Sequence, residues 1–154
     1  MPQQPVDALR QQLETQLANL TGGTKLVVFG CDQGADVRPL ATSDTAALSL
    51  ICAGMLPPSF IEYALRSGAD GIVIAGCHEG GCDFRLGMEW TRQRLVHQRE
   101  PHLRDKVPVE RVLVAPASHG EGRQLATAVA EFRNRLETQT LPDNKPPAYS
   151  RRNR

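Results

Sequence analysis

The residues of this chain best suited to chemistry are its four cysteines, Cys31, Cys52, Cys77 and Cys82. A cysteine can be a small buried apolar residue, a redox-active thiol, half of a disulfide or, as a thiolate, a ligand for a soft metal. The start of the chain has neither a basic flank nor an apolar segment, so we expect no signal peptide and a cytoplasmic protein. Because that compartment keeps thiols reduced, structural disulfides are not expected, and the other three roles stay open.

Apolar runs and helical stripes predict the elements that position these cysteines. Short apolar or β-branched runs predict buried strands at residues 25–30, 46–52, 71–76 and 111–115. Apolar residues spaced three and four apart predict helices at 6–20, 84–98 and 121–137. Another helix is expected after Ser59, its predicted N-cap, with Gly68 as its stop signal. This alternation predicts an α/β fold, a small doubly wound (Rossmann- or flavodoxin-like) parallel sheet of about four strands with helices on both faces.

Three of the cysteines fall where predicted strands end. Cys31 follows the first strand, Cys52 closes the second and Cys77 follows the third. The carboxyl ends of parallel strands share one edge of the sheet, which is where open α/β sheets bind ligands, so these thiols are predicted to converge there. The fourth, Cys82, can fold back to the same point across a glycine-containing loop.

Four thiolates in one place would bind zinc or an iron–sulfur cluster. A single cysteine at a strand end is usually an ordinary core residue. Four cysteines that share one edge of the sheet are harder to explain by core packing alone. The Cys77-x4-Cys82 step departs from the paired knuckles of structural zinc sites and occurs in plant-type [2Fe–2S] ferredoxins. Gly80 and Gly81 would let backbone N–H groups approach the sulfurs of a cluster. His78 is either a further ligand, as in Rieske centres, or a loop histidine that is hydrogen-bonded to the backbone.

Composition limits the class of protein. A chain of 154 residues with 40% hydrophobic and 23% charged residues is typical of one globular domain. A formal net charge of +1 argues against a nucleic-acid binder. The apolar runs are much shorter than the ~20 residues needed to cross a bilayer, so we expect no membrane insertion.

The stretches around the cysteines resemble a known family. They are residues 28–31, 51–61 and 67–82, with Gly87 and Arg94 downstream. The most specific part is a Gly-Ala-Asp-Gly strand start that leads into Gly-Cys-His-x-Gly-x-Cys. Over residues 25–137 the sequence resembles the delta, or iron–sulfur, subunit of methyl-viologen-reducing hydrogenase, which is also found as a domain fused to heterodisulfide reductase components.

The resemblance implies a [2Fe–2S] cluster with Cys31, Cys52, Cys77 and Cys82 as its ligands. It also implies a non-catalytic subunit that relays electrons between a dehydrogenase or hydrogenase and a flavin-containing, heterodisulfide-reductase-like partner. The family carries several cysteines and an aromatic residue at the first site, where only Cys31 stands here. The family's Cys-Ser-Gly-Arg is Cys-Ala-Gly-Met at residues 52–55, which lacks the basic residue.

The sequence thus predicts an N-terminal helix (1–23), an iron–sulfur α/β domain (24–137) and a flexible tail rich in proline and arginine (138–154). Two other functions stay open at this point. One is a structural zinc module for protein–protein assembly. The other is a thiol–disulfide switch formed by Cys77 and Cys82.

Overall fold

The computed structural model describes residues 6–21, 23–32, 34–50, 52, 56–77, 87–96, 109–118 and 120–138. The helices are α1 (Val6–Ala18), α2 (Pro58–Arg66), α3 (Gly87–Leu95) and α4 (Gly122–Thr138). The strands are β1 (Leu26–Cys31), β2 (Thr45–Leu50), β3 (Gly71–Ala75) and β4 (Val112–Val114). Two short 3-10 turns occupy Arg38–Leu40 and Val109–Arg111. The predicted tail begins at residue 138, which is the last residue of α4, and its residues 139–154 lie outside the described residues.

The four strands form one parallel sheet in the order β2-β1-β3-β4. The chain runs from β1 to β2 on one side and then crosses back to place β3 on the other side, so the order reverses beside β1. Every residue of β1 and β3 is buried. Strands that are covered on both faces read as near-continuous apolar runs, which is why the sequence predicted them. The predicted doubly wound α/β fold is confirmed.

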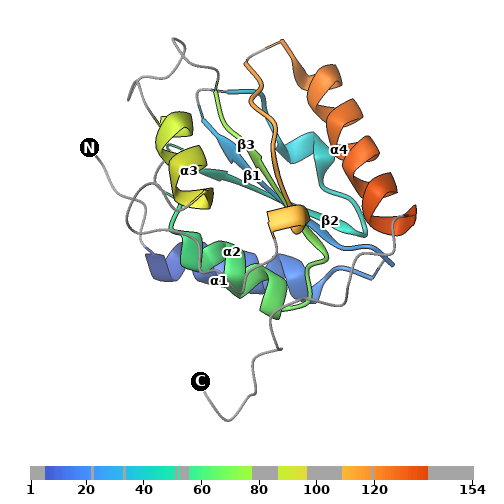
Figure 1. Ribbon diagram of the computed structural model, residues 1–154. Coiled ribbons are helices and arrows are strands. Elements are labelled where there is room, and N and C mark those ends of the chain that lie inside the picture. Colours follow the sequence, from blue (N-terminus) through green and yellow to red (C-terminus); the bar gives the residue numbers. More distant parts are fainter. Residues whose placement is uncertain are drawn as a thin grey trace.

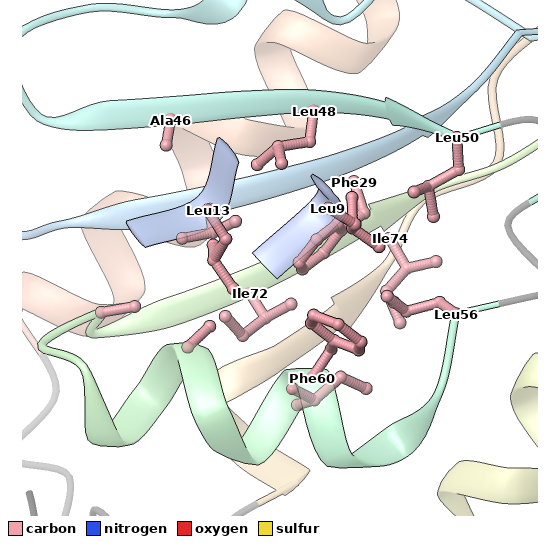
Figure 2. Close-up of a cluster of buried hydrophobic side chains, with 14 of the residues drawn as sticks. Leu9, Leu13, Phe29, Ala46, Leu48, Leu50, Leu56, Phe60, Ile72 and Ile74 are labelled. Carbon is pink, nitrogen blue, oxygen red and sulfur yellow. The ribbon is translucent and has the colours of Figure 1, made fainter. Parts of the chain in front are cut away.

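Helices cover both faces of the sheet (Figure 1), and two apolar clusters lie beneath them. Successive side chains of a strand point to opposite faces, so β1 contributes to both clusters. Val27 and Phe29 join the leucines of α1 and the apolar side of α2, as Figure 2 shows in part. Leu26 and Val28 pack with the other cluster, against the stripe of α4 formed by Leu125, Val129, Phe132 and Leu136.

Helix α2 ends as predicted but begins one residue before the predicted cap. Its first residue is Pro58 and its N-cap is Pro57, with no side-chain hydrogen bond at the cap, so the prediction that Ser59 caps this helix is wrong. Proline suits the first helical position because its ring fixes φ and its missing N–H would be unpaired there anyway. At the other end Gly68 adopts φ +114, and the N–H of Ala69 bonds the carbonyl of Ala64, which is a Schellman ending.

Helix α1 packs on one face of the sheet, and one of its side chains reaches the outer edge at β2. The Gln16 side chain accepts a hydrogen bond from the N–H of Ala47 in β2, at 3.0 Å. Leu13 is fully buried and Leu9, Leu17 and Leu20 belong to the same apolar cluster. A buried edge-strand N–H without a partner would cost stability. The Gln16 side chain supplies that partner and so links α1 to the outer edge of β2. None of the helices in the described ranges is long and apolar enough to cross a membrane.

Arg133 of α4 joins three segments at the amino end of the sheet. It donates hydrogen bonds to the carbonyl of Thr24 and the hydroxyl of Thr45, and it pairs with Asp44 at 3.1 Å. A hydrogen bond of 2.7 Å from the Thr42 hydroxyl lowers the pKa of Asp44, and the Arg133 guanidinium lowers it further.

This arrangement predicts a small acid-dependent loss of stability. Because the pKa of Asp44 is lower in the folded than in the unfolded protein, its stabilising contribution is complete above about pH 4 and is lost as the pH falls through the folded-state pKa. We expect Asp44→Asn to lower the free energy of unfolding by about 1 kcal/mol or less at neutral pH, since a third of the side chain is exposed. Urea unfolding of both proteins across acidic pH measures this, and a difference that does not shrink in acid would contradict it.

Candidate functional site

The carboxyl edge of the sheet carries the described cysteines on three neighbouring strands. Cys31 is the last residue of β1, Cys52 lies two residues beyond β2, and Cys77 lies two residues beyond β3. Since β1 pairs with β2 on one side and β3 on the other, Cys31 lies at the end of the middle strand. Neighbouring strands are about 5 Å apart, so the topology brings these chain positions to one region of the edge.

Burial gives these thiols apolar surroundings. Each of the three side chains is only 3% exposed. Cys31 and Cys77 belong to the cluster on the α1–α2 face, together with Leu56 and Leu95. Cys52 is buried but belongs to neither of the two clusters.

The described residues do not by themselves assemble a metal site. Among them no three His, Cys, Asp or Glu side chains are grouped so that they could hold a metal ion. The predicted fourth ligand, Cys82, lies outside the described residues, as do His78, Gly80 and Gly81. The predicted ligand set therefore stays a prediction, which a shared sheet edge makes possible without establishing it.

Backbone contacts join the loops that leave β1, β3 and β4. The N–H of Ala35 donates to the carbonyl of Ala117 at 2.9 Å, and the N–H of Ala117 donates to the carbonyl of Gly76 at 2.8 Å. Gly34 donates to the carbonyl of Cys31 at 2.9 Å. We call Gly34, Ala35, Gly76 and Ala117 the loop tie. It connects the backbone of Cys31 to the residue before Cys77.

Charged side chains stand beside the middle strand. Asp32 directly follows Cys31 and accepts a hydrogen bond of 2.5 Å from the Ser49 hydroxyl of β2. Asp36 pairs with Arg38 at 2.9 Å, and the hydrogen bonds from the Arg38 side chain and backbone lower the pKa of Asp36. Sequence reasoning missed this group and the loop tie. The one signal in the sequence was the run Asp-Gln-Gly-Ala-Asp after Cys31, which contains two aspartates and a glycine.

Comparison with known proteins identifies the family. A model of the family described as methyl-viologen-reducing hydrogenase, delta subunit, matches residues 26–139, well over half of the chain. The chain belongs to this family. The matched range begins with β1 and extends past the end of α4, so it contains the whole sheet.

Relatives of this delta subunit family carry related names. The chain is 36% identical over 83 residues to an F420-non-reducing hydrogenase iron-sulfur subunit of Archaeoglobus profundus, an alignment that covers 53% of this chain and 59% of that protein. It is 30% identical over 134 residues to the F420-non-reducing hydrogenase vhc iron-sulfur subunit of Methanococcus voltae, covering 78% and 91%. It is 28% identical over 87 residues to a ferredoxin:CoB-CoM heterodisulfide reductase subunit of Methanosarcina mazei, covering 56% and 11%.

The last alignment indicates that a segment of this delta-subunit type occurs inside a much longer protein. The chain spans a little over half of the Archaeoglobus protein and about a tenth of the Methanosarcina protein. The family model and the two hydrogenase relatives confirm the predicted resemblance to the delta subunit family.

Proposed function

We propose that this protein is a non-catalytic electron-transfer subunit that holds a [2Fe–2S] cluster at the carboxyl edge of its sheet. The observation that carries the proposal is the position of three buried cysteines at or just beyond the ends of three adjacent parallel strands, in a family whose members include subunits named iron–sulfur. The proposed ligands are Cys31, Cys52, Cys77 and Cys82. His78, Gly80 and Gly81 complete the proposed surroundings.

The donor set fits an iron–sulfur group. Cysteine thiolates are the ligands of most such clusters. Of the proposed donors, Cys31 ends β1, and Cys52 and Cys77 each lie two residues beyond the end of a neighbouring strand. The group, when bound, accepts and returns one electron at a potential that its surroundings set. The chain contributes the apolar cluster around Cys31 and Cys77, which limits the approach of water on the α1–α2 face. Backbone N–H groups of the glycine loop are proposed to stabilise the added negative charge.

The proposed partners are other oxidoreductase subunits. The two hydrogenase relatives are named as subunits of F420-non-reducing hydrogenases, and the third relative is named as part of a heterodisulfide reductase. We propose that this chain relays electrons in the cytoplasm between a dehydrogenase- or hydrogenase-type partner and a flavin-containing, heterodisulfide-reductase-like partner. A small carrier of this kind acts only where a donor and an acceptor dock on it.

Metal and sulfide analysis of the anaerobically purified full chain tests the proposal. We expect two iron atoms and two acid-labile sulfides per chain, visible absorption bands, and an EPR signal that appears on reduction with dithionite. A colourless protein with one tightly bound zinc would contradict the proposal and favour the structural zinc module. A metal-free protein that reversibly forms a Cys77–Cys82 disulfide would also contradict it and favour the thiol switch.

A further inference from the structure

Gly34 lies where a side chain would strike the backbone beside Cys77. A Cβ built on Gly34 would be 2.8 Å from the carbonyl oxygen of Ala117, 3.4 Å from the backbone nitrogen of Cys77 and 3.5 Å from the carbonyl carbon of Gly76. All three neighbours are backbone atoms, so no rotamer change can relieve the first contact. The φ of Gly34 is outside the left-handed region, so the position needs glycine for space alone.

The loop tie explains why this close approach matters. The N–H of Gly34 donates to the carbonyl of Cys31. The N–H of Ala35 donates to the carbonyl of Ala117, whose own N–H donates to the carbonyl of Gly76. These three hydrogen bonds form one path from the backbone of Cys31 to the peptide that precedes Cys77. A displacement of the Ala117 carbonyl therefore changes how the ends of β1 and β3 are held relative to each other.

We propose that Gly34 is a positioning residue that sets the separation of the Cys31 and Cys77 backbones. The inference rests on the proposed function, in which both cysteines ligate the cluster. The potential of an iron–sulfur group depends on the hydrogen bonds to its sulfurs and on its exposure to solvent, and both change when a ligand's backbone moves. Gly34 thus influences the proposed cluster without touching it. A side chain at this position would displace the backbone of Ala117 and Cys77.

The test compares Gly34→Ala with a matched Gly122→Ala control in the full chain, purified anaerobically. Gly122 also lies outside the left-handed region, and a Cβ there would meet nothing within 4 Å. We expect G34A to keep iron but to show a shifted midpoint potential and altered EPR g-values, with G122A unchanged. Because overpacking displaces neighbouring atoms, and the carbonyl displaced here belongs to the residue that bonds the peptide before Cys77, iron release to a chelator should be about tenfold faster in G34A.

A second substitution keeps the inference testable if G34A does not fold. Ala117→Gly removes only a β-methyl group and leaves the contacted carbonyl and its hydrogen bond from Ala35 in place, but it gives this backbone more conformational freedom. We expect it to shift the potential by itself. In the G34A/A117G double variant the loosened carbonyl can move away from the added Cβ, which should restore part of the wild-type potential. Unchanged potential, EPR signal and release rate in G34A would overturn the inference. If G34A does not fold, an unchanged potential in A117G would also overturn the inference, because the loop tie through which Gly34 acts would then not set the potential. Failure of the proposed function is distinct, because it appears as wild-type protein without iron and sulfide.

Discussion

Replacing Cys31 by serine is expected to abolish binding of the proposed iron–sulfur cluster. Cys31 ends the middle strand of the three that carry the cysteines, so it stands between the other described thiols in strand order. A serine hydroxyl is a harder and less acidic donor than a thiol, so it replaces a thiolate on iron poorly. Loss of even an outer-shell partner costs a metal site about 10- to 100-fold in affinity, and loss of a ligand should exceed that. Iron, sulfide and EPR measurements on anaerobic protein should show at least a tenfold drop, by the same comparison.

A matched control separates the lost ligand from the added hydroxyl. Ala46 of β2 is 1% exposed and belongs to the same apolar cluster as Cys31. Ala46→Ser therefore adds a hydroxyl to that cluster and leaves every cysteine in place, so we expect it to retain its iron. A Cys31→Ser protein with full iron and an unchanged EPR signal would contradict the assignment of Cys31 as a ligand.

The same pair of variants discriminates between cluster binding and a disulfide switch. A switch formed by Cys77 and Cys82 leaves Cys31 as a packing residue, so Cys31→Ser would then change stability but not the redox response. A cluster that needs all four thiolates loses its redox signal in that variant.

The fold could be predicted because its strands and helices carry strong local signals. Strands buried on both faces must be apolar throughout, and the runs at β1 and β3 are. The stripe of α4 and the Gly68 stop follow from helical spacing and from the conformational freedom of glycine. The error at the start of α2 arose because Ser59 and Pro58 are both common near helix starts, and the sequence does not show which one begins the helix.

The site could be predicted only as far as the sheet edge. Parallel strands must bring their carboxyl ends together, so the common edge of Cys31, Cys52 and Cys77 follows from fold class alone. The strand order and the contact of Gly34 with Ala117 depend on how distant segments pack, and no local periodicity records that.

The second prediction with a large expected effect concerns the stability of the apolar core that supports the end of β1, where Cys31 lies. Phe29 is fully buried in β1, two residues before Cys31, and lies opposite Leu48 of β2 and Ile74 of β3 in the sheet register. Figure 2 shows its ring between the sheet and the helices of the α1–α2 face. Truncation of a buried phenylalanine removes its apolar contacts and leaves a cavity that the neighbouring strands can close only in part.

Phe29→Ala should therefore lower the free energy of unfolding by about 3–5 kcal/mol, a large share of the roughly 5–15 kcal/mol that is typical of a domain. Urea unfolding of wild-type and variant protein with equal iron content measures this loss. Val96→Ala is the control, because Val96 is 57% exposed and its truncation should change stability by no more than about 0.5 kcal/mol. A loss below about 1 kcal/mol for Phe29→Ala would mean that the site collapses around the smaller side chain, against the close packing that holds β1 and its terminal cysteine in place.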